Sequence, residues 1–305
     1  MIVPLAFLID LWLGDPPNAW HPVAWMGHII AWGKRRAPVT PQERLRYGRG
    51  LIVLGSLGTG MIAWAVDRAL PNNRADALVR AVLLKLALSW HGLRGAATEI
   101  ETALKEKELA EARRLVSWHL VSRDVGQLDA GQVASAAIES VAENLSDSLV
   151  APLLYYVAGG LPAAWVYRFV NTADAMIGYR DPEHAELGQG AARLDDVLNT
   201  IPSRLTALCI AAAARVVGED GPGAWNTALG DHAQTDSPNA GWPMGAMAGA
   251  LGISLEKVDH YQLGDGPAPQ PGDIGRALRV AGVATAAALV GATLLRWLLA
   301  RSETR

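Results

Sequence analysis

Three carboxylates are spaced so that one helix face could carry them all. Glu139, Glu143 and Asp147 stand four residues apart and therefore project from the same side of an α-helix. Like charges at this spacing destabilise a helix by a few tenths of a kcal/mol, and by more where water is scarce. The stripe therefore indicates a face turned toward a cation: Mg²⁺, an ammonium group or nearby arginines. A solvated acidic face is the alternative reading, and the spacing does not decide between them.

A second polar region follows an uncharged run from Ser148 to Tyr167. It holds Asn171, Asp174, Arg180, Arg193, Asp195, Asp196 and Asn199. Asp195 and Asn199 are one helical turn apart. A shorter motif near the start places Asp15 and His21 among prolines, which fix backbone angles and can aim side chains, although rigid loops of no function look the same. Acidic groups beside apolar segments are costly unless cations or hydrogen bonds meet them.

Several familiar catalytic motifs are missing from the sequence. It has no G-x-x-x-x-G-K-[ST] phosphate loop, no G-x-S-x-G elbow and no H-E-x-x-H pair. Its one cysteine, Cys209, excludes an internal disulfide and a cysteine metal cluster. A formal net charge of −3 gives no general attraction to nucleic acid, so no nucleic-acid partner is expected.

The elements that must position these groups are helices in a membrane. Half of the 305 residues are apolar, 19% are charged, and the mean hydropathy is +0.15. Uncharged runs at 50–66 and 280–295 are credible spans, and 148–167 is a third. Six basic residues between 34 and 49 place that end of the first span in the cytoplasm. Gly159, Gly160 and Pro162 are expected to break the third run into two half-helices.

Lys85 lies in the middle of the apolar stretch 77–93, which fits a buried or interfacial helix at least as well as a free span. Leu205 to Ala214 reads as a short apolar helix, and no convincing strand is present. The prediction is an all-α, polytopic membrane protein with four or five membrane segments. Residues 1–305 are expected to form one integral-membrane domain with polar loops or helices at the membrane face.

Five segments in the same order resemble one known family. They are LGDPPNAWHPVAWMGHII, SRDVGQLD, AAIESVAENLSDSLVAPLLYYVAGGLPAAWVYRFVNTADAMIGYR, ARLDDVLNTIPSRLTAL and DSPNAGWPMGAMAGALG. The chain resembles the adenosylcobinamide-phosphate synthase family of cobalamin biosynthesis over nearly its whole length. The resemblance implies a bacterial or archaeal inner-membrane enzyme. It would join (R)-1-aminopropan-2-ol O-phosphate, or a related aminoalcohol, to the free propionate of adenosylcobyric acid in an ATP-dependent amide synthesis.

The resemblance also implies ATP and Mg²⁺ as cofactors, with the bilayer and other cobalamin-biosynthesis enzymes as partners. The residues then take hypothetical roles. As catalytic groups we name Asp15, His21, Asp174, Asp195 and Asp196. Asp15, His21 or Asp174 would deprotonate the attacking ammonium, and Asp195 and Asp196 would bind the ammonium or the metal ion. For Mg²⁺ we name Glu139, Glu143 and Asp147, since carboxylate oxygens suit this ion. For phosphate and the substrate amides we name Arg123, Arg180, Arg193, Asn144, Asn171, Asn199, Ser237 and Asn239. A membrane transporter or a non-catalytic scaffold is the competing class, because broken helices and polar clusters occur there too.

Overall fold

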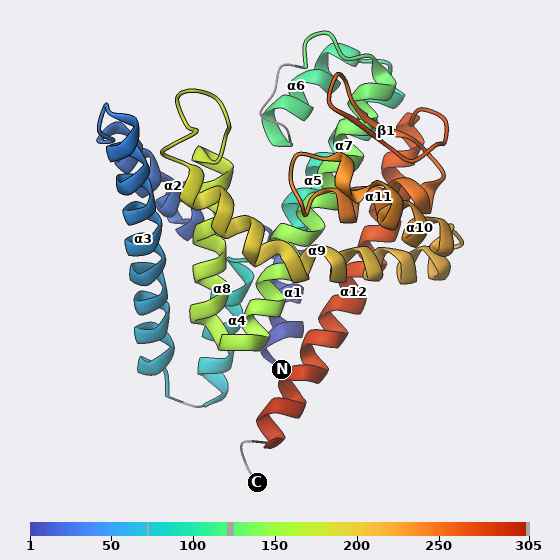
Figure 1. The fold of residues 1–305 in the computed structure, drawn as a ribbon. Helices are drawn as coiled ribbons and strands as arrows, with labels where there is room; N and C mark the ends of the chain where they lie inside the picture. Colours follow the sequence, from blue (N-terminus) through green and yellow to red (C-terminus); the bar gives the residue numbers. More distant parts are fainter. Residues whose placement is uncertain (72, 121–124, 303–305) are drawn as a thin grey trace. The chain divides into compact units, whose positions relative to one another are not determined.

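The structure is a computed structural model, and it describes residues 1–71, 73–120 and 125–302. Within these ranges the chain is almost entirely helical, as the sequence predicts (Figure 1). The chain divides into two compact units. The first comprises Met1–Ser89, Ala151–Asn199 and Ala292–Arg305, and the second comprises Trp90–Val150 and Thr200–Gly291. The prediction of a single domain over 1–305 stays a prediction.

The first unit is built around helix α8 (Ala151–Ile177). Helices α2 (Pro22–Arg35), α3 (Pro41–Ala69) and α4 (Arg74–Lys85) pack against α8, and α1 (Ile2–Leu13) packs against α4. In Figure 1, α3 runs beside α8. A short 3₁₀ turn, Asn18–Trp20, leads into α2, whose N-terminus begins with Pro22 and is capped by the His21 side chain.

Helix α8 is interrupted where the sequence predicts a break. Gly159 has φ −147° and ψ 22°, and Gly160 has φ 68° and ψ −157°, so neither is helical. The positive φ at Gly160 is a conformation that residues with a Cβ rarely adopt, which explains why a glycine stands there. Pro162 follows without an N–H to continue the hydrogen-bond ladder. The predicted division into two half-helices is confirmed.

The second unit surrounds α7 (Ala130–Leu145), which is buried along almost its whole length from Val133 to Ala142. Helices α5 (Trp90–Lys105), α6 (Leu109–His119) and α11 (Gly241–Leu251) pack around it. The second unit also contains a π-helical turn (Ser146–Val150), the C-terminal part of α9 (Gln189–Val217), α10 (Gly221–Asp231), a 3₁₀ turn (His232–Gln234) and most of α12 (Pro271–Ser302), which continues into the first unit. Helices α10 and α11 pack closely, because a Cβ on Gly249 would lie 2.3 Å from the Gly223 carbonyl oxygen.

A small hairpin in the second unit corrects the expectation of no strands. Strands β1 (Leu255–Lys257) and β2 (Tyr261–Leu263) pair antiparallel, with Glu256 opposite Gln262. Each strand is only three residues long, too short for an alternating pattern to stand out in the sequence. The hairpin matters because it covers one side of α7.

In the part of the chain that the structure describes, four helical segments are long and apolar enough to cross a membrane. They are Pro41–Ala69, Ala130–Ile177, Gln189–Val217 and Pro271–Leu299. This number agrees with the predicted four or five. Helix α9 (Gln189–Val217) is much longer than the predicted short helix from Leu205. Pro202 cannot bond to the carbonyl of Leu198, but the Tyr155 hydroxyl donates to that oxygen at 2.9 Å, so the helix continues through the proline.

Candidate functional site

A buried polar cluster joins α8 to α9 in the first unit. The Asp195 carboxylate is 8% exposed, and it accepts from Asn171 Nδ2 at 3.4 Å and from Asn199 Nδ2 at 2.9 Å. The Tyr167 hydroxyl in turn donates to Asn199 Oδ1 at 2.9 Å. We call these four residues the α8–α9 cluster. The hydrogen bonds offset the cost of burying a carboxylate among apolar helices, and three of the four residues are predicted site residues.

Further predicted residues lie along the same part of the chain. Asp174 and Asp196 are half-buried on α8 and α9, whereas Arg180 and Arg193 are exposed. A Cβ on Gly178 would lie 1.9 Å from Asp174 Oδ1, so this carboxylate lies against the C-terminal end of α8. The first unit therefore carries buried and half-buried carboxylates and exposed guanidinium groups on α8, α9 and the segment that joins them.

The predicted pair Asp15 and His21 belongs to a separate charged group. Lys85, 2% exposed, forms a short ion pair with Asp15 and lies 3.6 Å from Asp10 Oδ1, and Asp10 is fully buried. His21 Nε2 lies 3.5 Å from Asp15 Oδ1, while His21 Nδ1 accepts from the Val23 N–H at 3.2 Å.

These contacts determine the state of both predicted groups. Burial alone would raise the pKa of Asp15, but the hydrogen bonds and charges of His21 and Lys85 outweigh it and hold that pKa well below its usual range. The Val23 N–H requires an unprotonated Nδ1 on His21, so in neutral imidazole the proton is on Nε2, facing Asp15. Both ring nitrogens are thus engaged. These contacts are typical of residues that stabilise the start of α2, and they are less suited to a general base.

The predicted acidic stripe lies in the second unit. Glu139 is 6% exposed and accepts from Ser135 Oγ at 2.9 Å and from the Tyr261 hydroxyl at 3.0 Å. Glu143 is exposed, and Asp147 is half-buried within the π-helical turn. Within the described residues these three carboxylates do not form a group with ligand atoms close enough to share one ion. The metal site on this face stays a prediction.

The predicted substrate-binding residues of the second unit are held in place by hydrogen bonds within that unit. Asn144 Nδ2 donates to Ser140 O at 3.0 Å within α7. Ser237 Oγ accepts the Asn239 N–H at 3.2 Å, just before the start of α11. Asn239 Oδ1 accepts from Arg204 Nη1 at 2.9 Å, and the Arg204 guanidinium lies 4.9 Å from the centre of the Trp242 ring. The sequence analysis missed Arg204. Arg123, the remaining candidate, lies outside the described residues.

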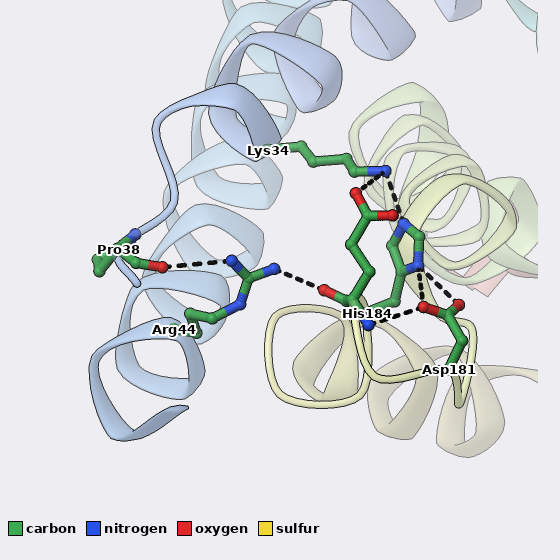
Figure 2. Close-up of polar contacts among 6 residues, drawn as sticks. Lys34, Pro38, Arg44, Asp181 and His184 are labelled. Carbon is green, nitrogen blue, oxygen red and sulfur yellow. Dashed lines mark hydrogen bonds and ion pairs between the residues drawn. The ribbon is translucent and has the colours of Figure 1, made fainter. Parts of the chain in front are cut away.

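A further polar group that the sequence analysis missed lies in the loop between α8 and α9. Figure 2 shows the Lys34 ammonium pointing toward His184, whose Nε2 lies at 2.7 Å. Glu183 Oε1 lies 2.9 Å from the same ammonium. The other ring nitrogen of His184 lies 2.7 Å from Asp181 Oδ2. Arg44 donates to the backbone carbonyl of Pro38 (Figure 2). It also donates to the backbone carbonyl of Glu183. The motif D-P-E-H places three polar side chains close together in the sequence and could have indicated a polar group. Its partner Lys34 could not have been found in this way, because it lies 150 residues away from His184.

Among the described residues, this loop group is the one in which three ligand atoms lie close enough to hold a metal ion. The ligand atoms of Asp181, Glu183 and His184 lie within 4.8 Å of one another, as a metal site requires. However, the Lys34 ammonium contacts two of the three, and Mg²⁺ prefers six oxygen ligands in octahedral geometry. The group does not fit a resident Mg²⁺: the lysine already supplies the positive charge.

Comparisons with known proteins agree on one family. The family model described as CobD/Cbib protein matches residues 3–290. The chain is 42% identical to the cobalamin biosynthesis protein CobD of Dehalococcoides mccartyi, over 87% of this chain and 86% of that one. It is 41% identical to the probable cobalamin biosynthesis protein CobD of Methanothermobacter thermautotrophicus, with the same two shares.

A third relative extends the match to more of the chain. The chain is 37% identical to the cobalamin biosynthesis protein CobD of Klebsiella pneumoniae over 93% of both chains. No solved structure matches it. The four candidate spans among the described residues, together with the family match, make this a multi-pass membrane protein. Taken with the match over residues 3–290, this shows that the chain belongs to the CobD/Cbib family of cobalamin biosynthesis proteins.

Proposed function

We propose that this protein is an adenosylcobinamide-phosphate synthase. It joins the amine of (R)-1-aminopropan-2-ol O-phosphate, or a related aminoalcohol, to the free propionate of adenosylcobyric acid, with ATP supplying the driving force. The match to proteins named for cobalamin biosynthesis supports the pathway. The multi-pass character supports a place in the inner membrane, where the basic residues between 34 and 49 face the cytoplasm, the compartment that holds ATP.

The observation that carries the proposal is the buried Asp195 carboxylate between two carboxamides. Ionisable side chains at membrane depth are expensive and usually functional. Asp195 is held on both oxygens by Asn171 and Asn199, so its orientation is set before any substrate arrives. Its neighbour Asp196 is only half-buried and can be reached by a substrate. A fixed and an accessible carboxylate side by side suit the binding of an ammonium group.

The reaction needs two displacement steps, and in each step one bond forms and one breaks. The propionate oxygen attacks the γ-phosphorus of ATP, ADP leaves, and an acyl phosphate forms. The amine then attacks the acyl carbon, the C–O bond breaks, inorganic phosphate leaves, and the amide remains. The ammonium must lose one proton before it attacks. Of the three predicted bases, Asp15 and His21 are engaged with Lys85 and with the N-terminus of α2. We assign the proton to Asp174, which lies one turn of α8 beyond Asn171 of the α8–α9 cluster, and the docking of the ammonium to Asp196, which follows Asp195 on α9.

ATP and Mg²⁺ enter the proposal as a substrate complex. Arg180 and Arg193 are exposed guanidinium groups that suit the phosphate oxygens, which they can bind with a bidentate fork. Since the loop group does not fit a resident Mg²⁺, the ion is proposed to arrive bound to the nucleotide phosphates, as Mg²⁺ commonly does. Glu139, Glu143 and Asp147 stay predicted ligands, and no step is assigned to them.

The test uses detergent-solubilised protein with adenosylcobyric acid labelled with ¹⁸O in its free carboxylate. Mass spectrometry should detect the amide only when ATP, Mg²⁺ and the aminoalcohol phosphate are all present. One ¹⁸O should appear in inorganic phosphate. Label in AMP would mean that the intermediate is an acyl adenylate and not an acyl phosphate. The proposal is refuted if amide does not form under any of these conditions.

Two variants then test the residues. Asp196→Asn should raise the KM for the aminoalcohol phosphate at least tenfold, and Asp174→Asn should lower kcat with a smaller change in KM. Glu106→Gln, an exposed carboxylate in the turn between α5 and α6, is the matched control and should behave as wild type. Wild-type kinetics in both site variants would remove these assignments.

The break in α8 is the observation that favours the competing function, transport of a corrinoid. Interrupted spans are common at the binding sites of transporters. Proteoliposomes loaded with buffer and offered radiolabelled cobyric acid separate the two functions. Uptake without amide formation would favour transport over synthesis.

A further inference from the structure

A polar pocket of about 280 Å³ lies in the second unit, between the start of α7 and the β1–β2 hairpin. Its walls come from three parts of the chain: Asp129, Gln132 and Ser135 around the first turns of α7, Glu256 and Gln262 on the hairpin, and the loop before α12. None of these five residues has a role in the proposed chemistry. We call this cavity the hairpin pocket.

The walls of the hairpin pocket are held in place by hydrogen bonds. Asp129 and Gln132 form a reciprocal cap, in which Asp129 Oδ1 accepts the Gln132 N–H at 2.8 Å and Gln132 Oε1 accepts the Asp129 N–H at 3.0 Å. Ser135 Oγ accepts the Glu256 N–H at 2.8 Å, which ties the hairpin to α7. Glu256 and Gln262 stand opposite each other across the hairpin. The cavity is thus formed in advance of any ligand.

The lining selects for hydrogen-bond donors. It carries two carboxylates, two carboxamides and two serine hydroxyls, and none of its residues is a lysine, arginine or histidine. Carboxylates only accept hydrogen bonds, and they repel other anions. A phosphate or a carboxylate is therefore disfavoured here, whereas an N–H group finds several acceptors.

This chemistry discriminates among the three substrates of the proposed reaction. ATP carries phosphate groups that the lining would repel. The aminoalcohol phosphate also carries an ammonium, which the lining would attract, but only three atoms separate its nitrogen from the phosphorus, so the repelled phosphate would have to enter beside it. The corrinoid carries primary carboxamides around its rim, each with two N–H donors and one acceptor oxygen. The volume lies at the lower end of small-molecule sites, so it admits side chains of the macrocycle and not the macrocycle itself.

We propose that the hairpin pocket binds carboxamide side chains of the corrinoid substrate. This inference rests on the proposed function for the identity of the ligand. It assigns a substrate-recognition role to Glu256 and Gln262, which sit on an exposed hairpin at some distance along the sequence from the carboxylates of α8 and α9.

The experiment measures binding of adenosylcobyric acid to detergent-solubilised full-length protein by equilibrium dialysis, with the corrin absorbance as readout and no ATP present. Glu256→Ala and Gln262→Ala change exposed hairpin side chains and should each raise Kd about 2- to 10-fold, as expected for a lost hydrogen bond. The double variant should raise it more than either single variant. Glu106→Ala is the matched control, and thermal unfolding verifies that each variant is folded.

A second measurement separates a direct contact from a structural effect. Wild type should bind a corrinoid whose side-chain amides are hydrolysed to carboxylates more weakly than the intact amide. Glu256→Ala should reduce this preference, because the repelling carboxylate is gone. KM values for ATP and for the aminoalcohol phosphate should be unchanged in both variants.

The outcomes distinguish this inference from the proposed function. Tight corrinoid binding that weakens in the hairpin variants, without amide formation by wild type, supports the pocket and refutes the synthase. Amide formation with unchanged corrinoid affinity in the double variant overturns the pocket. A changed KM for the aminoalcohol phosphate alone would also overturn it, as would wild type that fails to bind the corrinoid.

Discussion

Replacing Lys85 by methionine tests the buried charged group of the first unit. Met has nearly the same length as lysine, so the change removes a charge and leaves little empty space. Lys85 is 2% exposed, and its ammonium lies close to both Asp15 and the fully buried Asp10. Asp15 is 31% exposed and keeps His21 and water as neighbours, whereas Asp10 loses a cation in a place without solvent.

The magnitude follows from the protonation of Asp10. Without the ammonium, we expect the buried Asp10 to bind a proton in the folded state, which costs about 1.4 kcal/mol for each pH unit above its unfolded pKa of about 3.9. The loss is about 4 kcal/mol at pH 7 and about 1.5 kcal/mol at pH 5. The folded variant holds a proton that the unfolded chain releases, so its deficit relative to wild type grows as pH rises. At about 2–4 °C per kcal/mol, Tm falls by about 8–16 °C at pH 7 and by about 3–6 °C at pH 5.

The assay is thermal unfolding in detergent at both pH values. The double variant Asp10→Asn, Lys85→Met removes both charges and should recover much of the loss. Lys105→Met is the control, because Lys105 is 57% exposed and its pair with Glu101 contributes only tenths of a kcal/mol. A Lys85→Met protein with the wild-type Tm, or with the same loss at pH 5 and pH 7, would refute the reasoning.

Three further predictions use other features. The pKa of Asp15 is lower in the folded state than its unfolded value of 3.8, so Asp15 contributes stability above pH 3.8 that is lost as the pH falls below 3.8. Asp15→Asn should therefore flatten the dependence of Tm on pH between 5 and 3. Gly188→Ala should abolish the monodisperse peak in size-exclusion chromatography, because the new Cβ would lie 1.6 Å from the Ile177 backbone oxygen. The control Gly58→Ala places a Cβ with nothing within 4 Å and should raise the free energy of unfolding by up to about 1 kcal/mol. Asn199→Leu removes the acceptor of the buried Tyr167 hydroxyl and the donor to the Asp195 carboxylate, and it should cost about 1–3 kcal/mol in chemical unfolding. Tyr167→Phe leaves the bond from Asn199 to Asp195 in place and should cost less.

Features with local causes could be predicted from the sequence. Two adjacent glycines and a proline mark the break in α8, since each weakens the helix by itself. Spacing by four residues brings Asp195 and Asn199 within hydrogen-bond distance, as helix geometry requires. Uncharged runs mark the spans because the bilayer admits few charges.

Features that depend on distant partners could not be predicted. Lys85 argues against a free span, but nothing near it indicates that its partner Asp15 is 70 residues away. A proline inside a helix weakens it, and the partner that satisfies the carbonyl left free by Pro202 is the Tyr155 hydroxyl, which comes from α8 and is 43 residues away from Leu198. The site is similar: composition identifies its carboxylates and amides, while their grouping depends on tertiary contacts.

The length of α3 has a consequence for the lipid around the protein. Its uncharged part, Gly50 to Val66, has 17 residues and is about 26 Å long at 1.5 Å per residue. A typical hydrocarbon core is about 30 Å thick. Charged groups bound this segment on both sides, with Arg49 before it and Asp67 after it. The helix therefore favours a thin bilayer, and in reconstituted vesicles the protein should be most stable in lipids with shorter acyl chains.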